Sequence, residues 1–160
     1  MDAEQFTQLV VKPTLQYIGA YSFAAERLVL GTAVHESVGL KYIKQLGNGP
    51  ALGLFQMEPA THDDIWANYL RFNEPLKNAV RDLAGMRYRL RPIDASELIG
   101  NNNYACAMCR CHYKRIDEPL PDADDIPGMA SYWKRHYNTV KGAGTEQDFI
   151  ENYLKYIKES

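Results

Sequence analysis

The sequence lacks any apolar run long enough to cross a membrane, since no stretch approaches the roughly 18 apolar residues that a spanning helix needs. It also lacks the pattern of a secretory leader, because the acidic residues 1–5 lead into no long apolar core. We therefore expect a protein that is made in the cytoplasm without a signal peptide and does not insert into membranes.

An excess of positive charge is also missing. The chain has 18 basic and 20 acidic residues, which gives a net charge of -2, and such a chain has no general field for nucleic acid. We expect no nucleic-acid partner. The one local basic cluster, Arg87, Arg89 and Arg91, is interpreted as a solvated helix end, with binding of a partner or a polyanion as the alternative.

Cysteine is scarce and poorly placed for disulfides. The three cysteines, Cys106, Cys109 and Cys111, lie close together and are odd in number, which fits a reducing place of synthesis. Cys106 and Cys109 share a helix face, and His112 follows, but a single helix cannot place four ligands around one ion. We expect buried thiols, no metal site and no cofactor.

What the sequence has in abundance is helical periodicity. Its 160 residues, 46% of them hydrophobic, suit one domain over residues 1–160 with a real core. The class expected is mainly α. Apolar spacing, caps and prolines predict helices at about 3–21 with a break near Pro13, 22–38, 65–72, 76–87, 101–116, 128–137 and 145–158. The glycine-rich stretch 39–55 predicts a loop or a small β-hairpin.

One predicted helix carries the most informative residue. The run 28–34 is apolar almost all round, so this helix should be buried at the centre of the protein and carry Glu36 near its C-terminal end. A carboxylate delivered from a buried helix to the wall of an opening is partly desolvated. Desolvation raises its pKa toward the range of a general acid.

The residues around and after Glu36 form a recognisable pattern. His-Glu-Ser at 35–37, Gly-Leu-Phe-Gln-Met at 53–57 and Pro-Ala-Thr at 59–61 resemble the signature of lysozyme-like lytic transglycosylases and goose-type lysozymes. The resemblance implies an α+β lysozyme-like fold, with the catalytic Glu36 at the end of a central buried helix and a β-hairpin or loop beside a sugar-binding cleft.

The resemblance also implies substrate-binding residues. Gln56 would bind sugar from the cleft wall, and Ser37 would contact substrate, cap the helix end or orient Glu36. A Tyr-Asn pair is expected on a later helix, and Tyr137-Asn138 matches it best. The alternatives are Asn103-Tyr104 and Tyr113.

The reaction implied is cleavage of the β-1,4 bond between N-acetylmuramic acid and N-acetylglucosamine in peptidoglycan, with Glu36 as general acid and then base. Where some lysozymes carry a second carboxylate this chain has Gln45, and Asp63 and Asp64 are interpreted as acids favoured at a helix start. We therefore favour a lytic transglycosylase with a single catalytic Glu and a 1,6-anhydro product over a hydrolytic muramidase.

A peptidoglycan substrate lies outside the membrane, although no export signal is expected. A bacteriophage protein fits this combination, either associated with the virion, with tail or virion proteins as partners, or released as an endolysin. Two alternatives remain open: a catalytically silent lysozyme-like adaptor of a phage particle, and an enzyme that acts on a chitin-like polymer.

Overall fold

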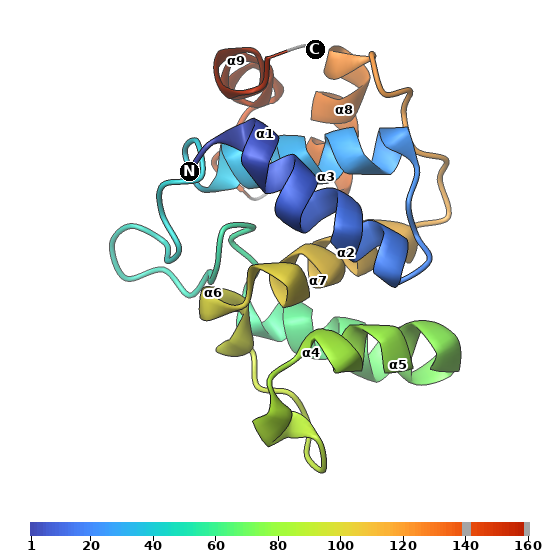
Figure 1. Cartoon of the computed structure of the whole chain (residues 1–160). Coiled ribbons are helices and arrows are strands. Elements are labelled where there is room, and N and C mark those ends of the chain that lie inside the picture. The colour runs from blue at the N-terminus through green and yellow to red at the C-terminus, as the bar shows by residue number, and fades with distance from the viewer. Residues whose placement is uncertain (139–141, 159–160) are drawn as a thin grey trace.

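The structure of the protein, a computed structural model, describes residues 1–138 and 142–158 and is mainly helical (Figure 1). Its α-helices are α1 (Ala3–Phe6), α2 (Lys12–Tyr17), α3 (Phe23–Glu36), α4 (Pro59–Asn68), α5 (Glu74–Leu83), α6 (Glu97–Gly100), α7 (Asn102–Lys114), α8 (Ile126–Trp133) and α9 (Glu146–Tyr156). Thr7–Val11 (η1) and Lys134–Asn138 (η4) are π-helical turns, and Leu70–Phe72 (η2) and Met86–Tyr88 (η3) are 3₁₀ turns.

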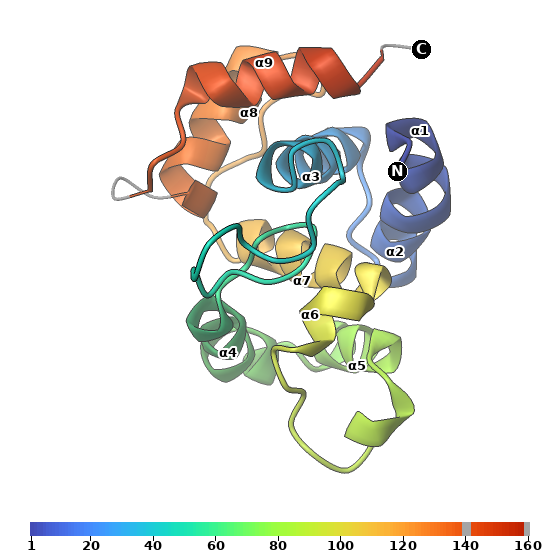
Figure 2. The same cartoon turned by 90° about the vertical axis from the view of Figure 1, so that its left-hand side faces the viewer.

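Helix α3 lies at the centre of the molecule. Figure 2 shows it nearly end-on, with α1 and α2 on one side, α8 on the other, α9 above and α7 beneath. The Ser22 side chain caps the helix by accepting a hydrogen bond from the Ala25 amide at 3.0 Å. Residues 28–34 are all buried, as their apolar character predicts. The predicted central helix is therefore confirmed.

Close packing of α9 on α3 depends on Gly31. A Cβ atom at this position would lie 2.9 Å from the rings of both Phe149 and Tyr153. Thr145 caps α9 in a reciprocal capping box with Asp148, which fixes where that helix begins. The absence of a side chain at Gly31 thus lets two aromatic rings of α9 approach the backbone of α3.

Helix α7 is also largely buried. Its three cysteines are free and fully buried, and burial raises the pKa of the Cys111 thiol to about 12. The hydroxyl groups of Thr32 and Tyr113 lie 2.7 Å apart and join α3 to α7. Within residues 1–138 and 142–158, no group of three His, Cys, Asp or Glu side chains is placed to hold a metal ion.

Several helix boundaries differ from those predicted. The break near Pro13 is the π-helical turn η1, and Pro13 lies in the first turn of α2, where its missing amide hydrogen is tolerated. The central helix ends at Glu36 rather than Val38, because residues 38–40 all have positive φ. Helix α5 ends at Leu83, so the 84–87 part of its predicted range is wrong.

The stretch 39–55, predicted as a loop or a small β-hairpin, forms a loop. Residues 37–58 contain two isolated β-bridges, Lys44 with Leu52 and Leu52 with Met57, and no strand is present anywhere in the described part of the chain. Leu52 and Met57 exchange both backbone hydrogen bonds, at 3.0 and 3.1 Å, around the tight turn 53–56. The mainly α class is therefore confirmed, and the described residues show the loop alternative here: irregular backbone fixed by local hydrogen bonds.

One continuous cluster of buried apolar side chains links α1 through α9. No helix that the structure describes is both long and apolar enough to cross a membrane.

Gly53 provides a test of this loop. Its φ is +76°, and a Cβ atom there would lie 2.3 Å from the backbone oxygen of Leu98. Gly47 has φ of +80° with open space around it, so it is a matched control for the conformational cost alone. We expect Gly47→Ala to lower the free energy of unfolding by about 1 kcal/mol and Gly53→Ala to lower it by about 2 kcal/mol more, because the α6 backbone must move. Urea unfolding measures both. Equal losses would mean that the 53–56 turn is not packed against α6.

Candidate active site

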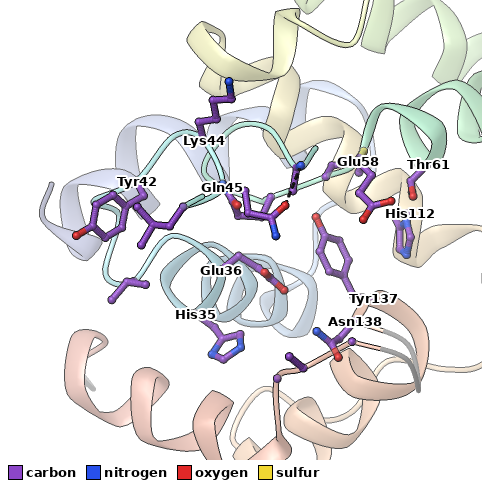
Figure 3. A pocket seen from close by; sticks show the side chains of 18 residues that line it. His35, Glu36, Tyr42, Lys44, Gln45, Glu58, Thr61, His112, Tyr137 and Asn138 are labelled. Carbon is purple, nitrogen blue, oxygen red and sulfur yellow. Dashed lines mark hydrogen bonds between the residues drawn. The ribbon is translucent and has the colours of Figure 1, made fainter. Parts of the chain in front are cut away.

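A cavity of about 540 Å³ opens beside the C-terminal end of α3. Its walls come from the end of α3, the loop 38–58, the first turn of α4, His112 of α7, and residues 137–138 and 142–144. Figure 3 shows the labelled side chains of Glu36, Tyr137 and Asn138 near one another in this cavity, with Glu58 close to Thr61 and His112. Segments far apart in the sequence therefore meet around one carboxylate.

Glu36 is the last residue of α3, and its half-buried side chain lines this cavity. Burial raises the pKa of its carboxyl group from 4.5 to about 7, and the only opposing influence is a hydrogen bond from Trp133 that favours the ionised form. The Trp133 indole nitrogen donates to Glu36 Oε1 at 2.9 Å. Near neutral pH, then, Glu36 can hold or release a proton.

Trp133 is itself held rigidly. It is fully buried, its ring meets the His35 ring edge-on with centroids 4.5 Å apart, and Phe149 packs against it at 5.4 Å. Asn152 of α9 donates a hydrogen bond to His35 Nδ1 at 2.9 Å, and burial lowers the pKa of His35. Neutral His35 thus supports the indole that orients Glu36.

Ser37 does not line the cavity, so the prediction that it contacts substrate is corrected. Its side chain is fully buried, donates to the Ala33 carbonyl at 2.6 Å and accepts from the Leu40 amide at 2.9 Å. Both hydroxyl functions are used by the backbone. The residue caps the end of α3, which is the structural alternative that the sequence left open.

Gln56 lies on the cavity wall in a left-handed conformation, with φ of +47°. Its Nε2 donates to the Gly53 carbonyl at 2.9 Å, which closes the 53–56 turn. A non-glycine residue in this region of backbone space costs about 1 kcal/mol or more and is often found at functional sites. The turn directs this side chain to the cavity in spite of that cost.

Tyr137 and Asn138 both line the cavity. The Tyr137 hydroxyl donates to the Phe55 carbonyl at 2.6 Å, which ties η4 to the loop beside Gln56, and its ring packs at 4.7 Å from the ring of His112. Lys134 uses its ammonium group on three oxygens of this edge: Asn138 Oδ1 at 2.8 Å, the Gly142 carbonyl at 3.0 Å and the Gly144 carbonyl at 2.6 Å.

The alternatives to this pair lie elsewhere. Tyr104 is fully buried and accepts a hydrogen bond from Trp66 at 2.8 Å, and Asn103 accepts one from Thr14 at 3.3 Å. Tyr113 is buried against Thr32. None of the three lines the cavity. The structure therefore brings Glu36, Gln56, Tyr137 and Asn138 together and leaves Asn103, Tyr104 and Tyr113 outside.

Sequence reasoning overlooked Glu58. This exposed residue is the N-cap of α4 and lines the cavity, whereas Asp63 contacts His62 and Asp64 pairs with Arg115, both away from it. Gln45 does line the cavity, with its side-chain oxygen accepting from the Ala51 amide. The sequence did carry an indication, because Pro59 favours a helix start and so leaves Glu58 at the tip of the loop.

Comparison with protein-family models, curated proteins and solved structures finds no match to this chain.

The raised pKa of Glu36 predicts a pH-dependent stability. The folded value of about 7 lies above the ordinary 4.5, so protonation of Glu36 favours the folded state below pH 4.5, and this contribution is lost as the pH rises through 7. The difference between these two pKa values corresponds to about 3 kcal/mol in the free energy of unfolding. Glu36→Gln keeps an acceptor for Trp133 but does not titrate. We expect the free energy of unfolding of the native protein, minus that of the variant, to fall by up to about 3 kcal/mol from pH 4 to pH 8. A difference that is flat across this range would contradict the assignment.

Proposed function

We propose that the protein is a glycosidase that cleaves the β-1,4 bond between N-acetylmuramic acid and N-acetylglucosamine in bacterial peptidoglycan. The observation that carries the proposal is Glu36, a half-buried carboxyl group in an open cavity with a pKa of about 7. A glycosidase needs such a group, because the leaving oxygen must receive a proton at neutral pH. The lysozyme-like signature at 35–37, 53–57 and 59–61 supports the same reaction.

In the proposed mechanism, protonated Glu36 donates its proton to the glycosidic oxygen as the bond from that oxygen to C1 of the muramic acid breaks. The cation that forms at C1 is stabilised by the oxygen of the substrate's own acetamido group. The Glu36 carboxylate then removes a proton from the acceptor hydroxyl that attacks C1. If the acceptor is the 6-hydroxyl of the same sugar, the product is a 1,6-anhydro sugar and the enzyme is a lytic transglycosylase.

Gln56, Tyr137 and Asn138 are proposed to hold the sugar. Asn138 Oδ1 is occupied by Lys134, and Nδ2 has no acceptor within the described residues, so this amide is free to donate to an acetamido carbonyl of the substrate. Tyr137 contributes by fixing the wall, since its hydroxyl is bonded to Phe55.

Glu58 keeps a hydrolytic route open. Glycosidases that use water commonly pair two carboxyl groups across the scissile bond, and Glu58 is a second carboxylate in the same cavity. Our preferred form remains the single-Glu transglycosylase, because Glu58 is exposed whereas Glu36 is half-buried.

For the biological setting, we propose a bacteriophage protein that reaches the cell wall as a virion component or as an endolysin. The virion role would bring tail or other virion proteins as partners.

The test is mass spectrometry of the soluble products from purified Gram-negative sacculi treated with the native protein, Glu36→Gln and Glu58→Gln. We expect the native protein and Glu58→Gln to release fragments that end in 1,6-anhydro-muramic acid, and Glu36→Gln to lose at least about 10³-fold in rate. Reducing-end products that disappear in Glu58→Gln would establish a muramidase.

Chitin oligomers, included as a second substrate, separate the chitin-like alternative from peptidoglycan cleavage. No product on any substrate, with the native protein folded, would contradict the enzymatic proposal and favour the silent adaptor.

A further inference from the structure

We propose that the protein has a second binding site, a basic groove that docks an acidic peptide segment of a partner protein through a large apolar side chain. The groove has a volume of about 620 Å³. Its walls include Trp66 from α4, Arg71 from η2, Lys77 and Arg81 from α5, and the loop 90–93. This proposal does not depend on the cleavage reaction.

The charge of the groove is opposite to that of the protein. Residues 71–91 contain six basic and two acidic side chains, a local charge of +4 in a chain whose net charge is -2. The groove itself is lined by four cationic side chains and one carboxylate, Asp63, whose Oδ1 is already bonded to His62 Nδ1 at 2.8 Å. An anionic partner is therefore favoured.

Three of the four cations are available to such a partner. Arg71, Lys77 and Arg91 form no ion pair with any residue that the structure describes. The Arg71 and Arg91 guanidinium groups lie 5.4 and 5.3 Å from the centres of the Phe72 and Tyr88 rings, which restricts their positions without neutralising them.

Arg81 has a different task. Its Nη2 donates to the backbone carbonyls of Tyr88 and Arg91, at 2.8 and 2.6 Å, and so fastens the loop that forms one wall of the groove. The position of the Trp66 ring is fixed by the core, because its indole nitrogen donates to the hydroxyl of buried Tyr104 at 2.8 Å. The groove is thus bordered by side chains whose positions are already set, which reduces the entropy lost on binding.

An exposed apolar side chain also lines the groove. Among the described residues, the three most exposed large apolar side chains are Leu90 at 99%, Phe72 at 75% and Met86 at 75%. All three belong to the segment 72–90, and Leu90 also lines the groove. Exposed apolar surface beside unpaired cations is typical of a protein-binding site.

These features favour a peptide over a polyanion. Nucleic acid binds through a track of phosphate contacts and gains little from an exposed leucine beside a hollow. A peptide that alternates carboxylates with large apolar side chains uses both features, since its acids meet Arg71, Lys77 and Arg91 while an apolar side chain enters the groove.

Helix α4 separates the groove from the candidate active site. Thr61, in its first turn, lines the cavity, whereas Trp66 and Ala67 line the groove. A partner docked in the groove therefore leaves the cavity open. This is the arrangement that a component of a larger assembly needs if it is to keep access to its substrate.

The test uses two synthetic peptides of equal length and charge, one repeating Glu-Glu-Phe and one repeating Glu-Glu-Ser, with tryptophan fluorescence and calorimetry at low salt as readouts. We expect the phenylalanine peptide to bind, and the serine peptide to bind at least about 5-fold more weakly because it has no apolar anchor. Leu90→Ser should weaken only the phenylalanine peptide.

Matched variants locate the site. The triple charge reversal Arg71→Glu, Lys77→Glu and Arg91→Glu should weaken binding at least about 10-fold, whereas Lys41→Glu, Lys114→Glu and Lys155→Glu, which change the net charge equally at exposed positions outside the groove, should leave it nearly unchanged. Circular dichroism confirms that both variants fold.

Several results would overturn the proposal. Equal binding of the two peptides, or tighter binding of a short DNA duplex, would indicate a general polyanion surface. No binding at low salt, or equal loss in the two triple variants, would mean that the groove is not a docking site.

Discussion

Partial removal of the Glu36 carboxyl group from water is the constraint on which the candidate site depends. Helix α3 is buried on all sides over 28–34 because these residues are almost all apolar. Its last residue, Glu36, therefore lies at the wall of a cavity rather than on a solvated surface. The single hydrogen bond from Trp133 holds the carboxyl group without cancelling the effect of desolvation, so its pKa rises to about 7. The burial of α3 therefore accounts for both the position of Glu36 and its raised pKa.

The walls of the cavity are built at the expense of backbone strain. Val38 and Leu40, which flank Gly39, and Gln56 all have positive φ, which a non-glycine residue adopts only when its surroundings compensate. The compensation is visible at Leu40, which is 5% exposed and whose amide is bonded to Ser37. The strained residues thus lie at the two ends of the loop 37–58, just after α3 and just before α4, where the chain borders the cavity.

Much of this could be predicted from the sequence, and the limits have physical reasons. The apolar run 28–34 and the Ser22 cap are local features, so they predicted the buried helix α3 and where it begins. The sequence left a loop and a small β-hairpin open for 39–55, because turn residues specify bends but not a ladder, and tertiary contacts such as that of Gly53 with α6 help to decide between them. Trp133 was not assigned to Glu36, since no spacing rule relates residues 97 positions apart. Ser37 was given too large a role because its burial is not a sequence property.

Direct titration of Glu36 tests the central claim. Its side-chain carboxyl carbon can be followed by NMR from pH 3 to pH 9, with the resonance assigned by its absence in Glu36→Gln. The account predicts a midpoint near pH 7. A midpoint near 4.5 would mean that the carboxyl group is fully solvated, and the interpretation of this cavity as a general-acid site would be wrong.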